Sequence, residues 1–128
     1  MSDRRPGALT PATALNLADL VAYAEGSIVS RAIVQEKVTS LTLFAFDAGQ
    51  ALSEHSTASD AYLQVLDGEA DLVVGGQRVV AHAGEVVLLP SGVPHEVNAR
   101  QRFKMLLTMV RAEPPADDLS SVGGRRWR

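Results

Sequence analysis

The stretch GEVVLLPSGVPHEV, residues 84–97, joins an apolar run to a turn and then to a histidine. Residues 86–89 are four consecutive apolar side chains, which is typical of a strand. Pro90 and Gly92 supply the chemistry of a turn. We therefore expect a strand, a turn and a return to extended chain at His95. The imidazole of His95 is left to be explained as a ligand, a general base or part of the core.

The same alternation of short apolar segments and turns runs through residues 27–110. Gly75 and Gly76 form a two-residue hairpin connection that needs positive φ angles. Asp67 and Gly68 are a further turn signal. Many short strands without intervening helices predict an all-β sandwich or barrel. The expected strands are residues 27–35, 41–46, 61–66, 69–74, 77–81, 85–90 and 103–110.

Residues 16–25 predict a short helix before the strands, because Asn16 can cap it and Gly26 can end it. Two of the strands, residues 41–46 and 103–110, are apolar on both faces. Such strands need a second cover besides the core. The helix or a second subunit could supply it, and we expect a homodimer to provide at least part.

Composition limits the class of protein. The chain has 128 residues, 46% of them apolar and 21% charged, which suits one globular domain. Its net charge of −3 gives no support to nucleic acid as a partner. No apolar run is long enough for a membrane span and the N-terminus lacks a signal-peptide core, so we expect a cytoplasmic protein. Because the chain has no cysteine, a metal would need nitrogen and oxygen ligands.

The two ends of the chain differ from its middle. Residues 1–13 and 112–128 are rich in Pro, Gly and charged side chains without periodicity, so we expect flexible tails. A single domain is then expected at residues 14–111, with the strands within 27–110. The final RRWR could bind anions, with Trp127 beside three arginines, but a solvated tail is the favoured interpretation.

The stretch around His95 matches a known motif, G-x5-P-x-G-x2-H-x3-N. The matching residues are Gly84, Pro90, Gly92 and His95, while Asn98 stands one position early. A second motif, G-x5-H-x-H-x3-E-x6-G, is matched by Gly49, His55 and Gly68. Seven positions at fixed spacing are specific.

Through these motifs the chain resembles the cupin superfamily over residues 27–110. The resemblance implies a cupin double-stranded β-helix, a jelly-roll-like barrel of two antiparallel sheets, with His55 and His95 pointing inside. In metal-binding cupins three histidines and one glutamate hold the ion. Here Thr57 and Ala61 stand at two of these positions, so two of the four usual ligands remain. The resemblance thus implies partial ligation of zinc, nickel, copper or iron by His55 and His95, or no cofactor.

Nearby carboxylates do not easily replace the missing ligands. Glu54 and Glu96 adjoin the histidines and would point to the other face of a regular strand. Asp60 could turn inward only through a bulge. His82 lies outside both motifs and is expected at the surface.

Strand phase extends the expected pocket. If His55, Thr57 and Ala61 face inward, Leu63 does too. The alternative is a filled core, in which methionine is a good gap-filler. The predicted ligand pocket consists of His55, Thr57, Ala61, Leu63, His95, Met105 and Leu107.

Three functions follow from this reading. The leading one is a small-molecule-binding cupin with a degenerate metal site. The first alternative is a metal-dependent enzyme that acts on a small carbonyl or carboxylate compound. The second is a protein-interaction module whose doubly apolar strands bury a partner. Whether the protein is an enzyme stays open at this point, because the cupin architecture hosts many functions.

Overall fold

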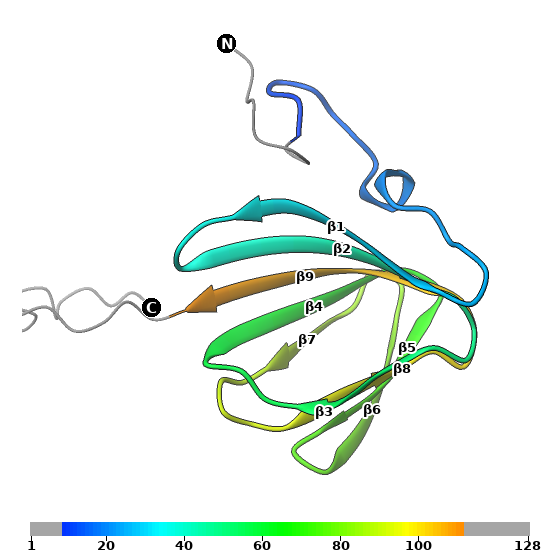
Figure 1. The fold of residues 1–128 in the computed structure, drawn as a ribbon, viewed down its shortest axis with the longest axis vertical. Helices are drawn as coiled ribbons and strands as arrows, with labels where there is room; N and C mark the ends of the chain where they lie inside the picture. The colour runs from blue at the N-terminus through cyan, green and yellow to red at the C-terminus, as the bar shows by residue number, and fades with distance from the viewer. Residues whose placement is uncertain (1–8, 112–128) are drawn as a thin grey trace, which may run out of the picture.

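The computed structural model of the protein describes residues 9–111 (Figure 1). These residues form nine β-strands and one turn of 3-10 helix. The elements are η1 (Leu17–Leu20), β1 (Ile28–Gln35), β2 (Thr39–Phe46), β3 (Ala51–His55), β4 (Ser59–Asp67), β5 (Glu69–Val74), β6 (Gln77–His82), β7 (Val86–Leu89), β8 (His95–Asn98) and β9 (Phe103–Arg111).

The strands build two antiparallel sheets, as the sequence predicts (Figure 1). Sheet A has five strands in the order β1-β2-β9-β4-β7, and sheet B has four in the order β3-β8-β5-β6. Non-consecutive strands lie side by side in both sheets. The chain therefore crosses repeatedly from one sheet to the other, which brings residues far apart in sequence together.

The main core lies between the sheets. Phe46 and Phe103 stack with ring centroids 4.5 Å apart, and both are fully buried. Along β4 the alternation is regular, with Leu63 and Val65 buried and Tyr62 exposed. This is the pattern of a strand with one face in a core.

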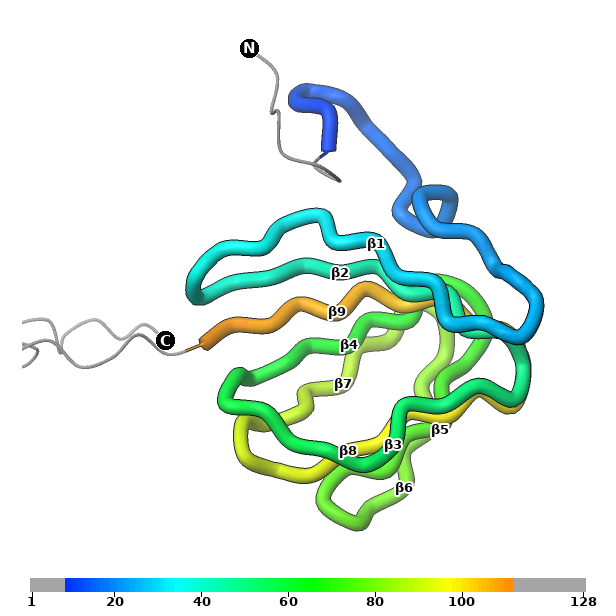
Figure 2. The backbone as a smooth tube through the Cα atoms, in the orientation of Figure 1, coloured from blue at the N-terminus to red at the C-terminus, as the bar shows by residue number. Residues whose placement is uncertain are grey.

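One end of the molecule carries the β1–β2 turn, the β3–β4 loop, the β7–β8 turn and the end of β9 (Figure 2). Hydrogen bonds join these segments: the Arg111 N–H donates to the Val38 carbonyl, and the Gly92 N–H donates to the Thr57 carbonyl. We call this the histidine end, since β3 finishes there at His55 and β8 begins there at His95.

The helix predicted over residues 16–25 is present only as a short turn, so its predicted length is wrong. Only Leu17–Leu20 are helical, in a single 3-10 turn that Asn16 caps by accepting from the Ala18 N–H at 3.0 Å. Val21 is already extended. Val21 and Tyr23 pack against sheet A as extended chain, while Ala22, Ala24 and Glu25 are exposed, so packing does not favour a longer helix here. No helix within residues 9–111 is long and apolar enough to cross a membrane.

The N-terminal segment nevertheless covers the outer face of sheet A (Figure 1). Val21 packs with Leu43, Ala45 and Leu106 in a second buried cluster, which Leu9 also touches. The chain itself thus supplies much of the second cover that the doubly apolar strands require. Residues 1–8 and 112–128, which hold most of the predicted tails and the RRWR ending, lie outside the described residues.

Candidate functional site

The two motif histidines meet at the histidine end of sheet B. His55 closes β3, His95 opens β8, and the two residues are direct cross-strand partners. Their ring centroids are 4.5 Å apart in an edge-to-face arrangement at 67°. Side chains forty positions apart in the chain therefore form one pair.

An irregularity in β3 makes this pairing possible. Leu52 lies opposite Val97 and His55 opposite His95, so three steps along β3 match two along β8. In a regular strand, Leu52 and His55 would point to opposite faces. The additional residue is a β-bulge, and it returns His55 to the face on which Leu52 and Val97 join the core.

The β7–β8 turn is fastened to the β3–β4 loop. The Gly92 N–H donates to the Thr57 carbonyl at 2.8 Å, and the Ser91 N–H donates to Asp60 Oδ1 at 2.8 Å. Gly92 has a φ of +79°, which a residue with a Cβ adopts at a cost. The two motifs are thus held together by one hydrogen bond between backbone groups and one from the backbone to the Asp60 carboxylate, which fixes His95 relative to His55.

The tautomers of both imidazoles follow from their partners. Nδ1 of His55 lies 2.9 Å from the Ser53 carbonyl, and Nδ1 of His95 lies 3.3 Å from the Val93 carbonyl. A carbonyl oxygen only accepts, so Nδ1 carries the proton in each neutral ring. Each Nε2 keeps its lone pair, and no side chain or backbone group of residues 9–111 hydrogen-bonds to it.

The two rings differ in their exposure to solvent. His95 is 6% exposed, whereas His55 is exposed to solvent. Desolvation by burial lowers the pKa of His95, His55 lowers it further by repulsion, and the Val93 carbonyl partly offsets both. His95 is therefore a neutral hydrogen-bond acceptor at neutral pH.

A complete metal site does not fit this donor set. The Thr57 hydroxyl donates to the Ser59 carbonyl at 3.0 Å and accepts from the Ser59 N–H at 3.3 Å. Asp60 is held by Ser91, and Ala61 offers only a methyl group. Among residues 9–111, no group of three or more His, Cys, Asp or Glu side chains could hold a metal ion. Two imidazoles alone fall short of the three or four ligands of ordinary transition-metal sites.

The other predicted pocket residues lie in sheet A. Ala61, Leu63 and Met105 are at most 2% exposed within the main core, and Leu107 packs against it. Leu63 and Leu107 are cross-strand partners. These side chains face sheet B, but whether a ligand reaches them stays a prediction.

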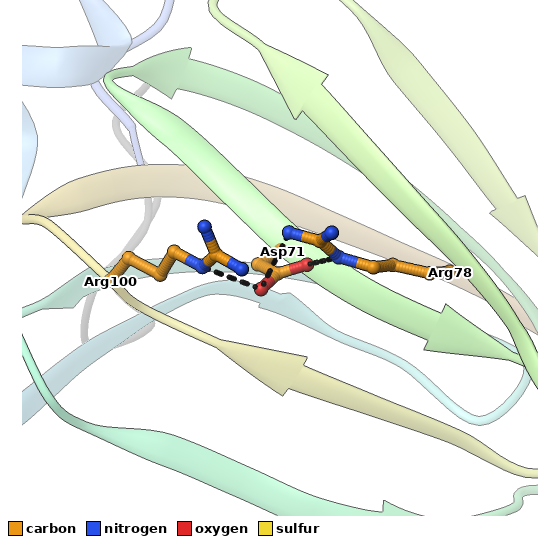
Figure 3. A network of polar contacts seen from close by, with 3 residues as sticks. All are labelled: Asp71, Arg78 and Arg100. Carbon is orange, nitrogen blue, oxygen red and sulfur yellow. Dashed lines mark hydrogen bonds and ion pairs between the residues drawn. The ribbon is translucent and has the colours of Figure 1, made fainter.

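His82 lies at the surface, as predicted. Its Nε2 is 3.3 Å from Glu69 and its Nδ1 is 3.2 Å from Glu85. A second surface cluster lies on the same sheet, where Asp71 accepts from Arg78 at 2.9 Å and from Arg100 at 3.1 Å (Figure 3). Hydrogen bonding by Arg78 and the charges of both arginines lower the pKa of Asp71.

Sequence reasoning missed a cavity of about 110 Å³, open to solvent, at the histidine end of sheet A. Its position follows from strand phase: Met109 and Arg111 continue the row of Met105 and Leu107 at two-residue steps. That row was the signal available in the sequence. The cavity is lined by Glu36, Lys37, Val38, Thr39, Ser40, Ser59, Met109 and Arg111.

Comparison with known proteins agrees with the cupin resemblance of the sequence. A family model described as "Cupin domain" matches residues 42–110. An uncharacterized protein from Streptomyces coelicolor is 35% identical over 63 residues, which are 49% of this chain and 60% of that protein. The match thus spans less than two thirds of that relative's length.

Solved structures are similar over more of the chain. A conserved protein of unknown function from Streptococcus pyogenes has a TM-score of 0.79 at 30% identity, covering 83% of this chain and 93% of that one. A cupin superfamily protein from Desulfitobacterium hafniense has a TM-score of 0.78 at 28% identity, covering 84% and 99%. A cupin 2 conserved barrel domain protein from Leptotrichia buccalis has a TM-score of 0.74 at 39% identity, covering 76% and 47%.

Proposed function

Since the chain belongs to the cupin domain family, we propose that it binds a small molecule at the His55–His95 pair, on the remnant of a metal site. One observation carries this proposal: both imidazoles turn Nδ1 to a backbone carbonyl and leave Nε2 free for a ligand. Two such atoms on rings 4.5 Å apart can address neighbouring groups of one small compound. The short set of polar groups beside an apolar core is typical of small-molecule sites.

The chemistry of the pair selects the ligand class. A neutral Nε2 accepts a hydrogen bond from a hydroxyl or an acid proton. His55 is exposed, so a ligand can reach the pair from solvent. Small hydroxylated or acidic carbonyl compounds fit this mode of binding.

The test uses protein purified without a histidine tag. We expect no stoichiometric metal under any loading condition and a rise in melting temperature with at least one compound of a small-acid library. The rise should disappear in a His55→Ala, His95→Ala double variant and persist in His82→Ala, because His82 lies among surface carboxylates. A rise that survives the double variant would overturn the proposal.

The second candidate function is a metal-dependent enzyme acting on a small carbonyl or carboxylate compound. The two free Nε2 lone pairs favour it, because neutral imidazole is a common ligand of zinc, nickel, copper and iron. Partial ligation by His55 and His95 would leave the other positions to water or substrate. Elemental analysis that finds one metal per chain, lost in the double variant, would favour this function over the first.

A further inference from the structure

The cavity at the histidine end of sheet A has a lining unlike the core behind it. It is formed by the β1–β2 turn, the first two residues of β2, the first residue of β4 and the end of β9. Its volume of about 110 Å³ accommodates a carboxylate with a short carbon chain, since one water molecule occupies about 30 Å³.

Strand register places this cavity on the inner side of sheet A. Met109 is the cross-strand partner of both Ser40 and Ala61, and directly opposite residues share a face. Ala61 faces the main core, so Ser40 and Met109 do too. Arg111 pairs with Ser59 two positions beyond Met109 and therefore lies on the same face.

The inner row of β9 changes character along its length. Phe103, Met105 and Leu107 belong to the core or pack against it, Met109 lines the cavity, and Arg111 ends the row. On β4 the same progression runs from Leu63 to Ser59. The inner face of the sheet thus becomes polar and cationic at the histidine end.

The cations of the cavity lack partners that comparable residues have. Arg78 and Arg100 pair with Asp71, and Arg102 pairs with Asp47. Within residues 9–111, no ion pair is formed by Lys37 or by the Arg111 guanidinium. With Glu36 also in the lining, the cavity holds two cations against one carboxylate.

We infer that this cavity binds the carboxylate of a small organic acid, with Arg111 as its principal partner. The inference rests on the proposed function, because it places the acid group of a ligand at the end of the barrel that carries the histidine pair. The planar guanidinium matches a carboxylate in a bidentate geometry, and Lys37 adds a second positive charge. The hydroxyls of Ser40 and Ser59 can donate to the anion, while Met109 provides an apolar contact for a carbon chain.

The apolar contact favours an organic acid over an inorganic anion. Phosphate would be served by the same cations but would gain nothing from Met109. Inorganic phosphate is therefore the comparison ligand, and butyramide, an uncharged amide of similar shape, is the comparison for butyrate.

The experiment is a titration followed by NMR of methionine methyl groups. Met109 lines the cavity, whereas Met105, four residues earlier in the same strand, is buried in the core and serves as an internal control. We expect millimolar butyrate to shift the Met109 methyl signal more than that of Met105. Butyramide and phosphate should bind about tenfold more weakly or not at all, because they lack either the charge or the carbon chain.

Variants separate the inference from a general effect of charge. Arg111→Gln should weaken butyrate binding at least about tenfold, as expected for loss of a charge-assisted bidentate contact. Arg100→Gln removes the same charge from the outer face of sheet B and should leave binding unchanged. Equal binding of butyrate and butyramide, full affinity in Arg111→Gln, or no shift of Met109 by butyrate would each overturn the inference.

The outcomes distinguish this inference from the proposed function. An acid that raises the melting temperature through His55 and His95 without depending on Arg111 supports the function and contradicts the inference. Butyrate binding that depends on Arg111, together with a library in which no compound acts through His55 and His95, supports the inference and contradicts the function.

Discussion

His95 shows how the fold controls the charge of a single side chain. Its ordinary pKa is 6.5, and burial beside His55 lowers it in the native state. At pH values between the native pKa and 6.5, the unfolded chain binds more protons than the folded one. The free energy of unfolding must therefore fall as the pH drops below about 6.5, and the loss levels off below the native pKa.

We expect urea denaturation to show this loss between about pH 7.5 and about pH 5.5, a range in which Asp47 and Asp71, whose pKa values are lowered, stay ionised. His95→Gln should lose less stability over the same range. An unchanged pH dependence in His95→Gln would mean that other groups cause the loss.

At Gly68 the backbone lies close to the backbone of Arg102, which a substitution can test. It has a φ of +75°, and a Cβ built there would lie 2.4 Å from the Arg102 carbonyl oxygen. Gly84 has a φ of +93° but nothing within 4 Å of such a Cβ. Gly84→Ala should therefore lose only the cost of the backbone conformation, roughly 1 kcal/mol. Gly68→Ala should lose on the order of 3 kcal/mol, because strain and clash add. Equal losses in thermal denaturation would contradict this.

At the level of elements, the attachment of the N-terminal segment to sheet A involves Tyr23. Its hydroxyl donates to Asp67, and its ring lies beneath Arg102 and Lys104, at 5.1 Å and 4.9 Å from the ring centroid. Lys104 in turn donates to the Ala18 carbonyl at 2.6 Å. The segment is thus attached to sheet A by polar contacts around one aromatic ring, in addition to the apolar cluster.

Tyr23→Phe should keep the ring contacts and lose the hydrogen bond, which lowers the free energy of unfolding by about 1 kcal/mol. Amide hydrogen exchange of residues 17–26 should become faster. The other tyrosine, Tyr62, is 42% exposed, and Tyr62→Phe should change neither quantity. The same exchange rates in Tyr23→Phe and wild type would show that the apolar cluster alone holds the segment.

Two elements were not predicted correctly from the sequence. Residues 16–25 have the cap and apolar spacing of a helix, but the structure favours extended chain after one turn because Val21 packs on sheet A. β3 was not predicted because its side chains are mostly exposed and its bulge breaks the two-residue period. Local patterns do not contain these long-range contacts.

At the level of the whole molecule, the outer face of sheet A remains partly uncovered. Tyr62 on β4 is the cross-strand partner of Leu88 on the edge strand β7, and Val86 follows on the same face. They are 42%, 46% and 60% exposed. Such a patch at a sheet edge supports the homodimer expected from the sequence.

Sedimentation equilibrium should therefore give twice the 13.6 kDa mass of one chain. Leu88→Lys should shift the protein towards the monomer, whereas Val80→Lys, on sheet B, should not. A wild type that is monomeric at every concentration would contradict the prediction and leave this face to the protein-interaction function.

The fold and the histidine pair were predictable for the same reason. Gly84, Pro90, Gly92 and His95 match a motif of the cupin family, and that resemblance implies both the barrel and the convergence of His55 and His95. The cationic cavity was not predictable, because Lys37 and Arg111 are 74 positions apart and meet only through the register of β2 and β9.

The bulge in β3 places one additional residue between Leu52 and His55. Deleting a single amino acid between Leu52 and His55 would make two steps along β3 match two along β8, so simple alternation would leave the first imidazole on the inner face, opposite its partner. The paired nitrogen donors therefore do not depend on the additional residue itself, and a barrel that lost it would keep the pair on a straight strand.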